Sequence, residues 1–226
     1  MGDDATLVPL LTSVNVACGF HAGDPSTIRE TLALAAAHGV AVNAHVSFPD
    51  LQGFGRRDLA ASPEQIEADT LYQVGALAAL ADAAGVQVLA VKPHGALYHR
   101  SLHDPASAAA IVAAVKSWRP TAAVVTAPDG ALFVAANAAR LTVVTEGYVE
   151  RGYAPDGQLI PRGSPGDVIE DPEAAASQAV TLARSGRYRS LCVHGDARLA
   201  AVVATATRAA LADAGFDLSA PGPATR

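Results

Sequence analysis

The chain has 226 residues, half of them hydrophobic, and a formal net charge of −6. This length is typical of one α/β domain, and the negative charge argues against a nucleic-acid-binding protein. The sequence has no apolar run long enough to span a membrane and does not start with a basic and then apolar leader. We therefore expect a cytoplasmic protein, in which Cys18 and Cys192 are small buried thiols in a reducing setting.

Six apolar stretches read as strands, and most of them are followed by an alanine-rich helical stretch. The strands are expected at residues 13–17, 40–44, 86–91, 121–126, 141–145 and 190–193. Residues 3–12 read as a short helix or an irregular lead-in. Residues 217–226 read as a flexible tail or a short last strand. Strand-then-helix units without hairpin signals predict a parallel sheet.

Proline after a capping residue marks the start of most expected helices. A carboxylate or hydroxyl accepts hydrogen bonds from the N–H groups of the first turn, and proline is tolerated at the first helical position. The pairs are Asp24-Pro25, Ser62-Pro63, Asp104-Pro105 and Asp171-Pro172. Residues 46–58 form a long polar segment whose length and glycine content favour a functional loop, and residues 147–167 are expected to be an irregular segment with turns.

The expected fold is one α/β barrel domain over residues 1–226 rather than an open, doubly wound sheet. Ionisable residues follow nearly every expected strand, whereas an open sheet concentrates its site at one switch point.

Four of the seven histidines follow directly on expected strands, at the end where parallel α/β sheets keep their active sites. They are His21, His45, His94 and His194. Together they can serve as general acids and bases near neutral pH or as ligands of a divalent metal ion. One such histidine alone is more often a structural residue, so the recurrence is what favours function. The other three, His38, His99 and His103, are interpreted as surface residues.

Other ionisable residues share these positions. Lys92 ends an apolar run and must pair with an anion or reach solvent, which favours a functional role. Asp24 is a helix cap that lies close to His21 in sequence, and the two roles can coexist. Arginines in loops are usually solvated, but they also hold carboxylates and phosphates. Those in the two long loops are Arg56, Arg57, Arg151 and Arg162.

Several common motifs are missing from the sequence. It contains no G-x-x-x-x-G-K-[ST] loop, no G-x-G-x-x-G turn, no G-x-S-x-G elbow, no H-E-x-x-H and no paired C-x-x-C. Nucleotide binding by a standard loop and acyl-serine chemistry are therefore not expected.

Five motifs in this order resemble the LamB/YcsF family, and they extend over essentially the whole chain. They are SVNVACGFHAGDP, AHVSFPDLQGFGRR, VKPHGALY, the stretch from Glu146 to Arg162, and CVHGD. The resemblance implies a seven-stranded β/α barrel akin to the carbohydrate deacetylases. It also implies cleavage of the lactam 5-oxoproline to L-glutamate, coupled to ATP hydrolysis, together with partner subunits B and C.

The resemblance implies site residues at the polar positions of these motifs. The expected catalytic residues are His21, Asp24, His45, Lys92, His94, Glu146, His194 and Asp196. The expected substrate- or phosphate-binding residues are Arg151, Tyr153 and Arg162. ATP is expected to be used through the partner subunits, and a divalent metal ion is the other candidate cofactor. Glu150 stands where aspartate is common, and Phe48 replaces a tyrosine and is left out of the site.

Members of the family usually begin with a strand reading roughly D-L-N-x-D-x-G-E, and this sequence begins after it. We therefore expect a barrel that lacks its first strand, through a mis-assigned start codon or a truncation. Two other functions stay open. One is a metal-dependent amide or ester hydrolase, as among the related barrels, and the other is a non-catalytic partner of the remaining subunits.

Overall fold

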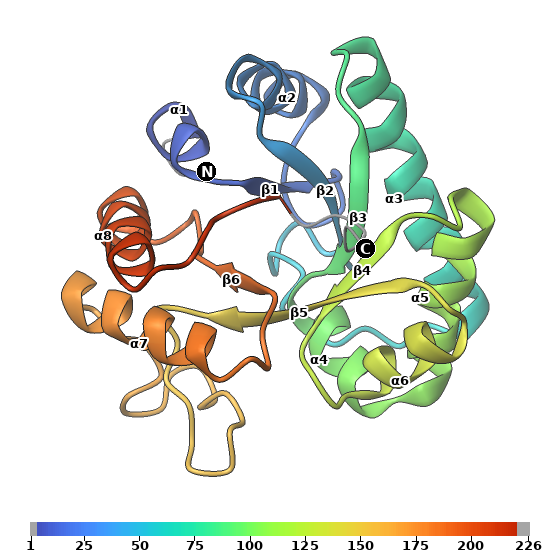
Figure 1. Ribbon diagram of the computed structural model, residues 1–226. Coiled ribbons are helices and arrows are strands. Elements are labelled where there is room, and N and C mark those ends of the chain that lie inside the picture. Colours follow the sequence, from blue (N-terminus) through green and yellow to red (C-terminus); the bar gives the residue numbers. More distant parts are fainter. Residues whose placement is uncertain (1–3, 221–226) are drawn as a thin grey trace. The chain divides into compact units, whose positions relative to one another are not determined.

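The computed structural model describes residues 4–220, which contain six parallel strands (Figure 1). Each strand pairs with the next one along the chain, in the order β1-β2-β3-β4-β5-β6. The strands are β1 (Ser13–Ala17), β2 (Ala41–Val46), β3 (Val88–Pro93), β4 (Ala123–Thr126), β5 (Thr142–Tyr148) and β6 (Ser190–Cys192). The α/β class with six parallel strands is confirmed, and residues 4–220 contain no seventh strand.

The helices are α1 (Asp4–Leu7), the short 3-10 helix η1 (Val8–Leu10), α2 (Pro25–His38), α3 (Pro63–Ala83), α4 (Gly95–His103), α5 (Pro105–Trp118), α6 (Ala131–Ala138), α7 (Pro172–Arg184) and α8 (Ala200–Asp213). Of these, α2, α3, α5 and α7 begin at the predicted capping pairs. The side chains of Asp24, Ser62, Asp104 and Asp171 each accept hydrogen bonds from the first turn. No helix within residues 4–220 is both long and apolar enough to cross a membrane.

Helix α4 is the element that the sequence does not predict. It begins directly after β3, and its N-cap residue, His94, makes no capping hydrogen bond with its side chain. The usual start signal is therefore missing. Gly95 takes its place: it has a φ of 54°, and a Cβ there would collide with the carbonyl oxygen of Gly55. The close turn from strand into helix needs glycine at this position.

Three strands extend further than predicted, and each takes in a polar residue at its carboxyl end. His45 lies within β2, Lys92 within β3 and Glu146 within β5. The apolar pattern stops at a polar side chain, so the sequence predicts that the strand ends there. The backbone nevertheless stays paired beyond that point, as the pairing of His45 with Lys92 shows. Residues 214–220 form no strand, and the rest of the expected last strand lies outside the described residues.

The described chain divides into two compact units. The larger unit, residues 12–145, holds β1 to β4, the first part of β5 and helices α2 to α6. The smaller unit, residues 4–11 and 146–219, holds the rest of β5 together with β6, α1, η1, α7 and α8. Strand β5 contributes to both, because Thr142–Thr145 pair with β4 and Glu146–Tyr148 pair with β6.

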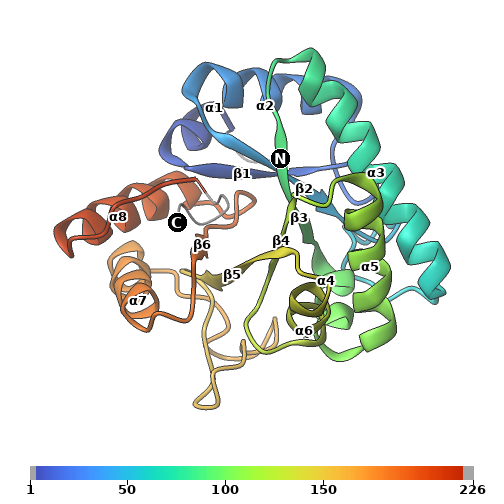
Figure 2. The ribbon, with the colours of Figure 1, turned by 45° about the vertical axis from the view of Figure 1, so that its right-hand side comes forward.

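The core of the larger unit is built from strands that are covered on both faces. All four residues of β4 are buried, and Ala90, Ala123, Val125 and Val144 pack into one cluster. Helices α3 and α5 run alongside each other, as Figure 2 shows. Cys18 is buried as expected, and burial raises the pKa of its thiol to about 12.

The smaller unit is built around a pair of helices. Helices α7 and α8 lie side by side in both views (Figures 1 and 2). Val149, Ala175, Ala179 and Val203 form one core cluster of this unit, and Cys192 is also buried in it. Residues 149–171, between β5 and α7, form the expected long loop.

Candidate active site

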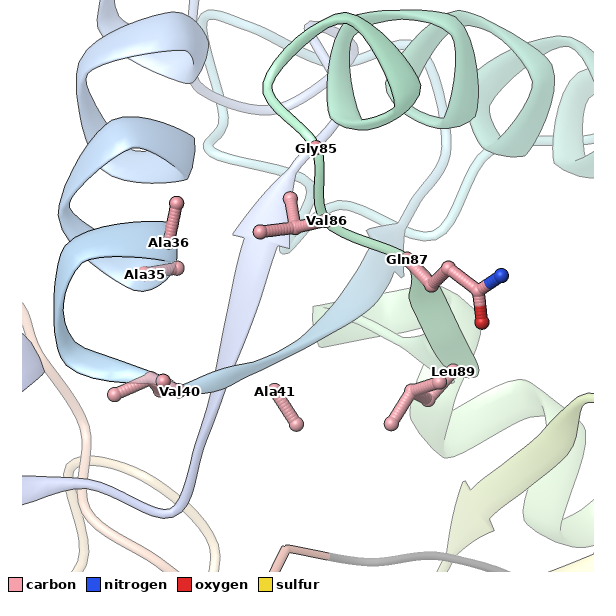
Figure 3. A pocket seen from close by; sticks show the side chains of 9 residues that line it. Ala35, Ala36, Val40, Ala41, Gly85, Val86, Gln87 and Leu89 are labelled. Carbon is pink, nitrogen blue, oxygen red and sulfur yellow. The ribbon is translucent and has the colours of Figure 1, made fainter.

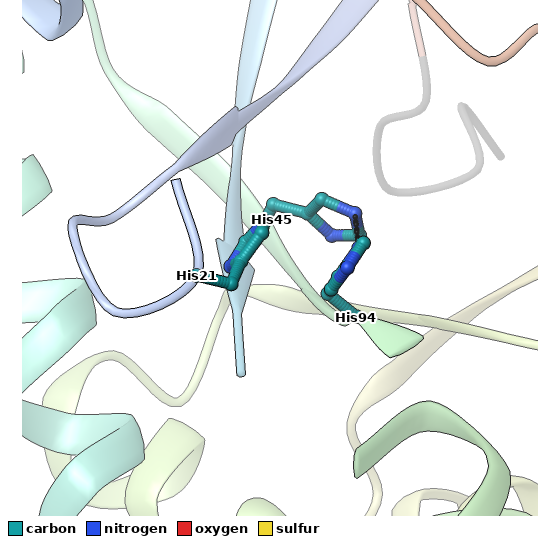
Figure 4. A group of neighbouring side chains, drawn as sticks. All are labelled: His21, His45 and His94. Atoms are coloured by element: carbon teal, nitrogen blue, oxygen red, sulfur yellow. Dashed lines mark hydrogen bonds between the residues drawn. The ribbon is translucent and has the colours of Figure 1, made fainter. Parts of the chain in front are cut away.

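Three of the expected site residues meet at the carboxyl ends of β1, β2 and β3 in the larger unit (Figure 4). His21 lies in the loop after β1, His45 lies within β2, and His94 is the N-cap of α4. One ring nitrogen of each lies within 4.8 Å of the others. Neighbouring parallel strands bring these residues together because their carboxyl ends lie at one edge of the sheet.

Backbone carbonyl groups fix the tautomers of His45 and His94. Nδ1 of His45 lies 3.1 Å from the carbonyl oxygen of Lys92, and Nε2 of His94 lies 2.8 Å from that of Phe54. Because a carbonyl oxygen accepts hydrogen bonds and never donates, both of these nitrogens must carry a hydrogen. The other ring nitrogens, Nε2 of His45 and Nδ1 of His94, lie 3.1 Å apart.

His21 is fixed in a similar way. Its Nδ1 lies 2.9 Å from the hydroxyl of Ser47, which donates its own hydrogen to the carbonyl of Phe48. His21 therefore donates from Nδ1 and keeps a lone pair on Nε2. Its ring stacks on that of His94, with centroids 3.9 Å apart and planes 6° from parallel.

The surroundings of the cluster keep two of its imidazoles neutral. Burial, together with the charges of His94 and Arg56, lowers the pKa of His21 to about 3. Burial also lowers the pKa of His45 well below its ordinary value, and the neighbouring ammonium of Lys92 adds to this effect. At physiological pH both rings can therefore offer a lone pair, either to a proton in transit or to a metal ion.

The loop after β2 packs closely against these rings. Asp50 is buried and forms an ion pair with Arg57, and this interaction lowers the pKa of its carboxyl to about 2. Gly55 has a φ of 65°, and a Cβ there would come within 2.9 Å of Cβ of His21 and of Cδ2 of His94. A larger residue would therefore displace the histidines.

Two other expected site residues belong to the larger unit. Lys92 is buried in β3, beside His45 in the register of the sheet. The carboxylate of Asp24 caps α2 by accepting hydrogen bonds from the N–H groups of Ser26 and Thr27, at 2.9 and 3.1 Å. The capping role of Asp24 is confirmed, and its role in a site stays a prediction.

A second cluster lies in the smaller unit and is centred on His194. Nδ1 of His194 is hydrogen-bonded to the carboxylate of Glu150, which also accepts from the backbone N–H of His194 at 3.1 Å. Nε2 lies 3.4 Å from the guanidinium of Arg162, and the ring stacks on Tyr148 with centroids 5.3 Å apart. This geometry assigns the hydrogen to Nδ1 and leaves Nε2 as a proton acceptor.

Glu150 is the residue that sequence reasoning misses. Burial opposes its ionisation, but the hydrogen bond and charge of His194 outweigh burial and hold the pKa of this carboxyl below its ordinary value. Because the pattern predicts that β5 ends at residue 145, Glu150 falls in the loop beyond it and stands out only as an exchange for aspartate. The signal in the sequence that could have identified Glu150 is that it keeps a carboxylate at the position directly before Arg151.

Arg151 and Tyr153 hold the loop of the smaller unit together. Arg151 is buried, and its guanidinium donates to the carbonyl oxygens of Asp167 at 2.9 Å and Ile160 at 2.6 Å. The hydroxyl of Tyr153 accepts from the backbone N–H of Tyr148 at 2.8 Å. Their roles in binding substrate or phosphate stay predictions.

The expected site residues thus fall into two groups, one in each unit. Within the smaller unit, Glu146 is buried in β5, whereas Asp196 is exposed two residues after His194. The larger unit contains His21, Asp24, His45, Lys92 and His94, and the smaller contains Glu146, Arg151, Tyr153, Arg162, His194 and Asp196.

A pocket of 340 Å³ lies at the opposite end of the strands of the larger unit (Figure 3). It is formed where α2 leads into β2 and where the chain enters β3, and its lining includes Ala35, Val40 and Val86. None of its lining residues has an ionisable side chain, so it has no group for acid-base chemistry.

Comparison with known proteins gives consistent results. A model described as the LamB/YcsF family matches residues 1–225. The 5-oxoprolinase A subunit of Thermus thermophilus is 47% identical over 231 residues, which cover 97% of this chain and 92% of that protein. That of Streptomyces griseus is 46% identical, covering 96% and 92%. A crystal structure of a lactam utilization protein, also from Thermus thermophilus, has a TM-score of 0.92 and 45% identity, covering 98% and 93%.

Proposed function

The chain belongs to the LamB/YcsF family, and on that basis we propose that it is the A subunit of an ATP-dependent 5-oxoprolinase. This enzyme opens the lactam ring of 5-oxoproline to give L-glutamate, and the A subunit works together with subunits B and C. The observation that carries the proposal is the near full-length similarity, at about 45% identity, to proteins named as the A subunit of 5-oxoprolinase. We further propose that the six strands belong to a seven-stranded barrel that forms one domain.

The chemistry of a lactam explains the need for ATP. An amide carbonyl is a poor electrophile, and phosphorylation of its oxygen makes the carbon open to attack by water. The C–N bond then breaks, the nitrogen takes a proton, and a second water molecule releases phosphate. Because the sequence has no standard phosphate-binding loop, we assign ATP binding to subunits B and C.

In this proposal His194 is the general base that removes a proton from the attacking water. The ionised carboxylate of Glu150 holds Nδ1–H, so that Nε2 keeps its lone pair. Arg162 lies beside this nitrogen and can hold the charge of a carboxylate or a phosphate. This arrangement provides a base and an anion-binding group at one place in the smaller unit.

The test is a coupled assay for ATP-dependent glutamate release with all three subunits. We expect turnover when the chain is present and loss of turnover with His194→Ala. The control is His38→Ala, which changes an exposed residue at the end of α2. Glutamate formed by subunits B and C alone at an equal rate would contradict the proposal. Binding to B and C without any turnover would favour a non-catalytic partner instead.

A second candidate function is a metal-dependent amide hydrolase, and the histidine cluster of the larger unit favours it. The rings of His21, His45 and His94 offer three nitrogen ligands. A metal ion held there would supply a Lewis acid and a water of lowered pKa. Amide hydrolysis without ATP, abolished by a chelator and restored by metal, would support this function over the first.

A further inference from the structure

The rings of His45 and His94 face each other through nitrogens that carry no hydrogen. A neutral imidazole has one N–H group, and each ring directs that group to a backbone carbonyl, of Lys92 or of Phe54. The remaining nitrogens, which lie 3.1 Å apart, therefore both present lone pairs. Two lone pairs at this distance repel each other unless a cation lies between them.

A metal ion fits the gap between these two nitrogens. Bonds of about 2.0–2.1 Å from a tetrahedral metal ion to two nitrogens would place the nitrogens about 3.4 Å apart. The two nitrogens are 3.1 Å apart, so they would need to separate only slightly to bind such an ion.

We propose that His21, His45 and His94 form a binding site for one divalent transition-metal ion. His21 contributes Nε2, because its Nδ1–H is directed to the hydroxyl of Ser47. One ring nitrogen of each of the three histidines lies within 4.8 Å of the others, so the three can approach one metal ion. Three protein nitrogens leave a fourth position of the metal ion for water or substrate.

The surroundings have the form of a metal site. Each ring donates its second N–H to a carbonyl or a hydroxyl, which is how metal-binding histidines are usually oriented. Among the described residues, the three side chains that lie close enough together to share a metal ion are all histidines. Imidazole ligands suit Zn²⁺, Co²⁺, Ni²⁺ or Cu²⁺, whereas Mg²⁺ and Ca²⁺ require oxygen ligands.

A substitution of Lys92 tests whether the histidine cluster binds a metal ion. Lys92 pairs with His45 in the register of the sheet, and its positive charge is expected to oppose a cation bound at this site. We therefore expect Lys92→Met, which removes the charge and keeps a long side chain, to raise metal affinity by about tenfold. A lysine with a merely structural role would leave metal affinity unchanged or lower it.

The experiment uses the untagged full chain after treatment with a chelator. Zn²⁺ is titrated in, and metal content is measured per chain, while Co²⁺ is followed by its visible absorption. We expect one metal ion per chain, and a loss of affinity of about a hundredfold or more in His45→Ala and in His94→Ala. His38→Ala, at the exposed end of α2, is the matched control and should bind as the unaltered chain does.

X-ray absorption by Zn²⁺ on the unaltered chain keeps the test independent of whether the variants fold. Imidazole nitrogens in the metal's coordination shell support the site. Binding below one ion per chain, or equal binding by the unaltered chain and folded His45→Ala, would overturn the proposal. Because the readout is metal content, its failure leaves the 5-oxoprolinase proposal standing, and failure of the glutamate assay leaves the metal site standing.

Discussion

The carboxylate of Glu150 is buried against His194, and within residues 4–220 its Oε2 has no hydrogen-bond partner. Its other oxygen accepts both from the ring and from the backbone N–H of His194. Burying an ionised group with one oxygen unsatisfied is costly. We infer that Glu150 is a positioning residue, which sets the tautomer and direction of the His194 ring.

Glu150→Gln keeps the shape of this side chain and removes its charge. If the proposed function holds, we expect kcat in the glutamate assay to fall by about a hundredfold or more, with little change in KM, because His194 loses the partner that orients it. Steady-state kinetics and a thermal melt of the chain measure the two effects. Glu170→Gln, at an exposed position in the same loop, is the control. An unchanged kcat in the folded variant would remove Glu150 from this role.

Gly55 and Gly39 form a matched pair for testing the space around the histidines. Both have a φ of 65°, so alanine at either position costs about 1 kcal/mol of backbone strain. A Cβ at Gly39 meets nothing within 4 Å, whereas one at Gly55 would come within 2.9 Å of atoms of His21 and His94. We expect Gly55→Ala to destabilise the chain more than Gly39→Ala and also to weaken Zn²⁺ binding. Chemical denaturation and metal titration measure both effects, and equal results for the two variants would contradict the packing argument.

The loop that follows β2 is held by hydrogen bonds at Ser47, where it begins, and by those between Asp50 and Arg57. Gln73 of α3 is fully buried and makes two hydrogen bonds of 2.9 Å to the backbone of Ser47, one to its N–H and one to its carbonyl. Further on, Asp50 accepts hydrogen bonds from the N–H of Gly53 and from the guanidinium of Arg57. These contacts place the carbonyl of Phe54 where it fixes the ring of His94.

The contribution of Asp50 to the stability of the fold should depend on pH, and Asp50→Asn tests this dependence. The pKa of Asp50 is about 2 in the folded chain, below its ordinary value of 3.8. A carboxyl with a depressed pKa stabilises the fold above the ordinary value, and that contribution is lost as pH falls through about 2. We therefore expect the unaltered chain to have the higher Tm at neutral pH, with the difference shrinking below about pH 4.

Thermal melts across this pH range make the measurement. Asp82→Asn, at an exposed position on α3, controls for the loss of one carboxylate. A difference in Tm that stays constant down to about pH 3 would show that the ion pair with Arg57 is not what stabilises this loop.

Elements whose signals are local are predictable from the sequence. The start of α2 follows from Asp24-Pro25, because capping depends on a few adjacent residues. The start of α4 does not, because it depends on the close approach of Gly95 to Gly55, which are forty residues apart. The carboxyl end of β5 escapes prediction for a similar reason: Glu146 stays in the strand because its backbone pairs with Ser190.

At the scale of the whole molecule, the strand ends identify four histidines but not which of them meet. His21, His45 and His94 come together because β1, β2 and β3 are neighbours in one unit. His194 belongs to the other unit and pairs with Glu150 there. Both arrangements depend on pairing between segments that are far apart in the sequence and on how the chain divides into units. Local sequence patterns therefore predict neither of them.

The burial of both cysteines has a practical consequence for labelling the protein. Cys18 and Cys192 are shielded by the fold, and a thiol with a pKa of about 12, as at Cys18, is hardly ionised near neutral pH. A cysteine introduced at an exposed position, such as Val134 on α6 with 62% of its surface accessible, would react with a maleimide well before either native thiol. One fluorophore can thus be attached at a chosen site without altering the native cysteines.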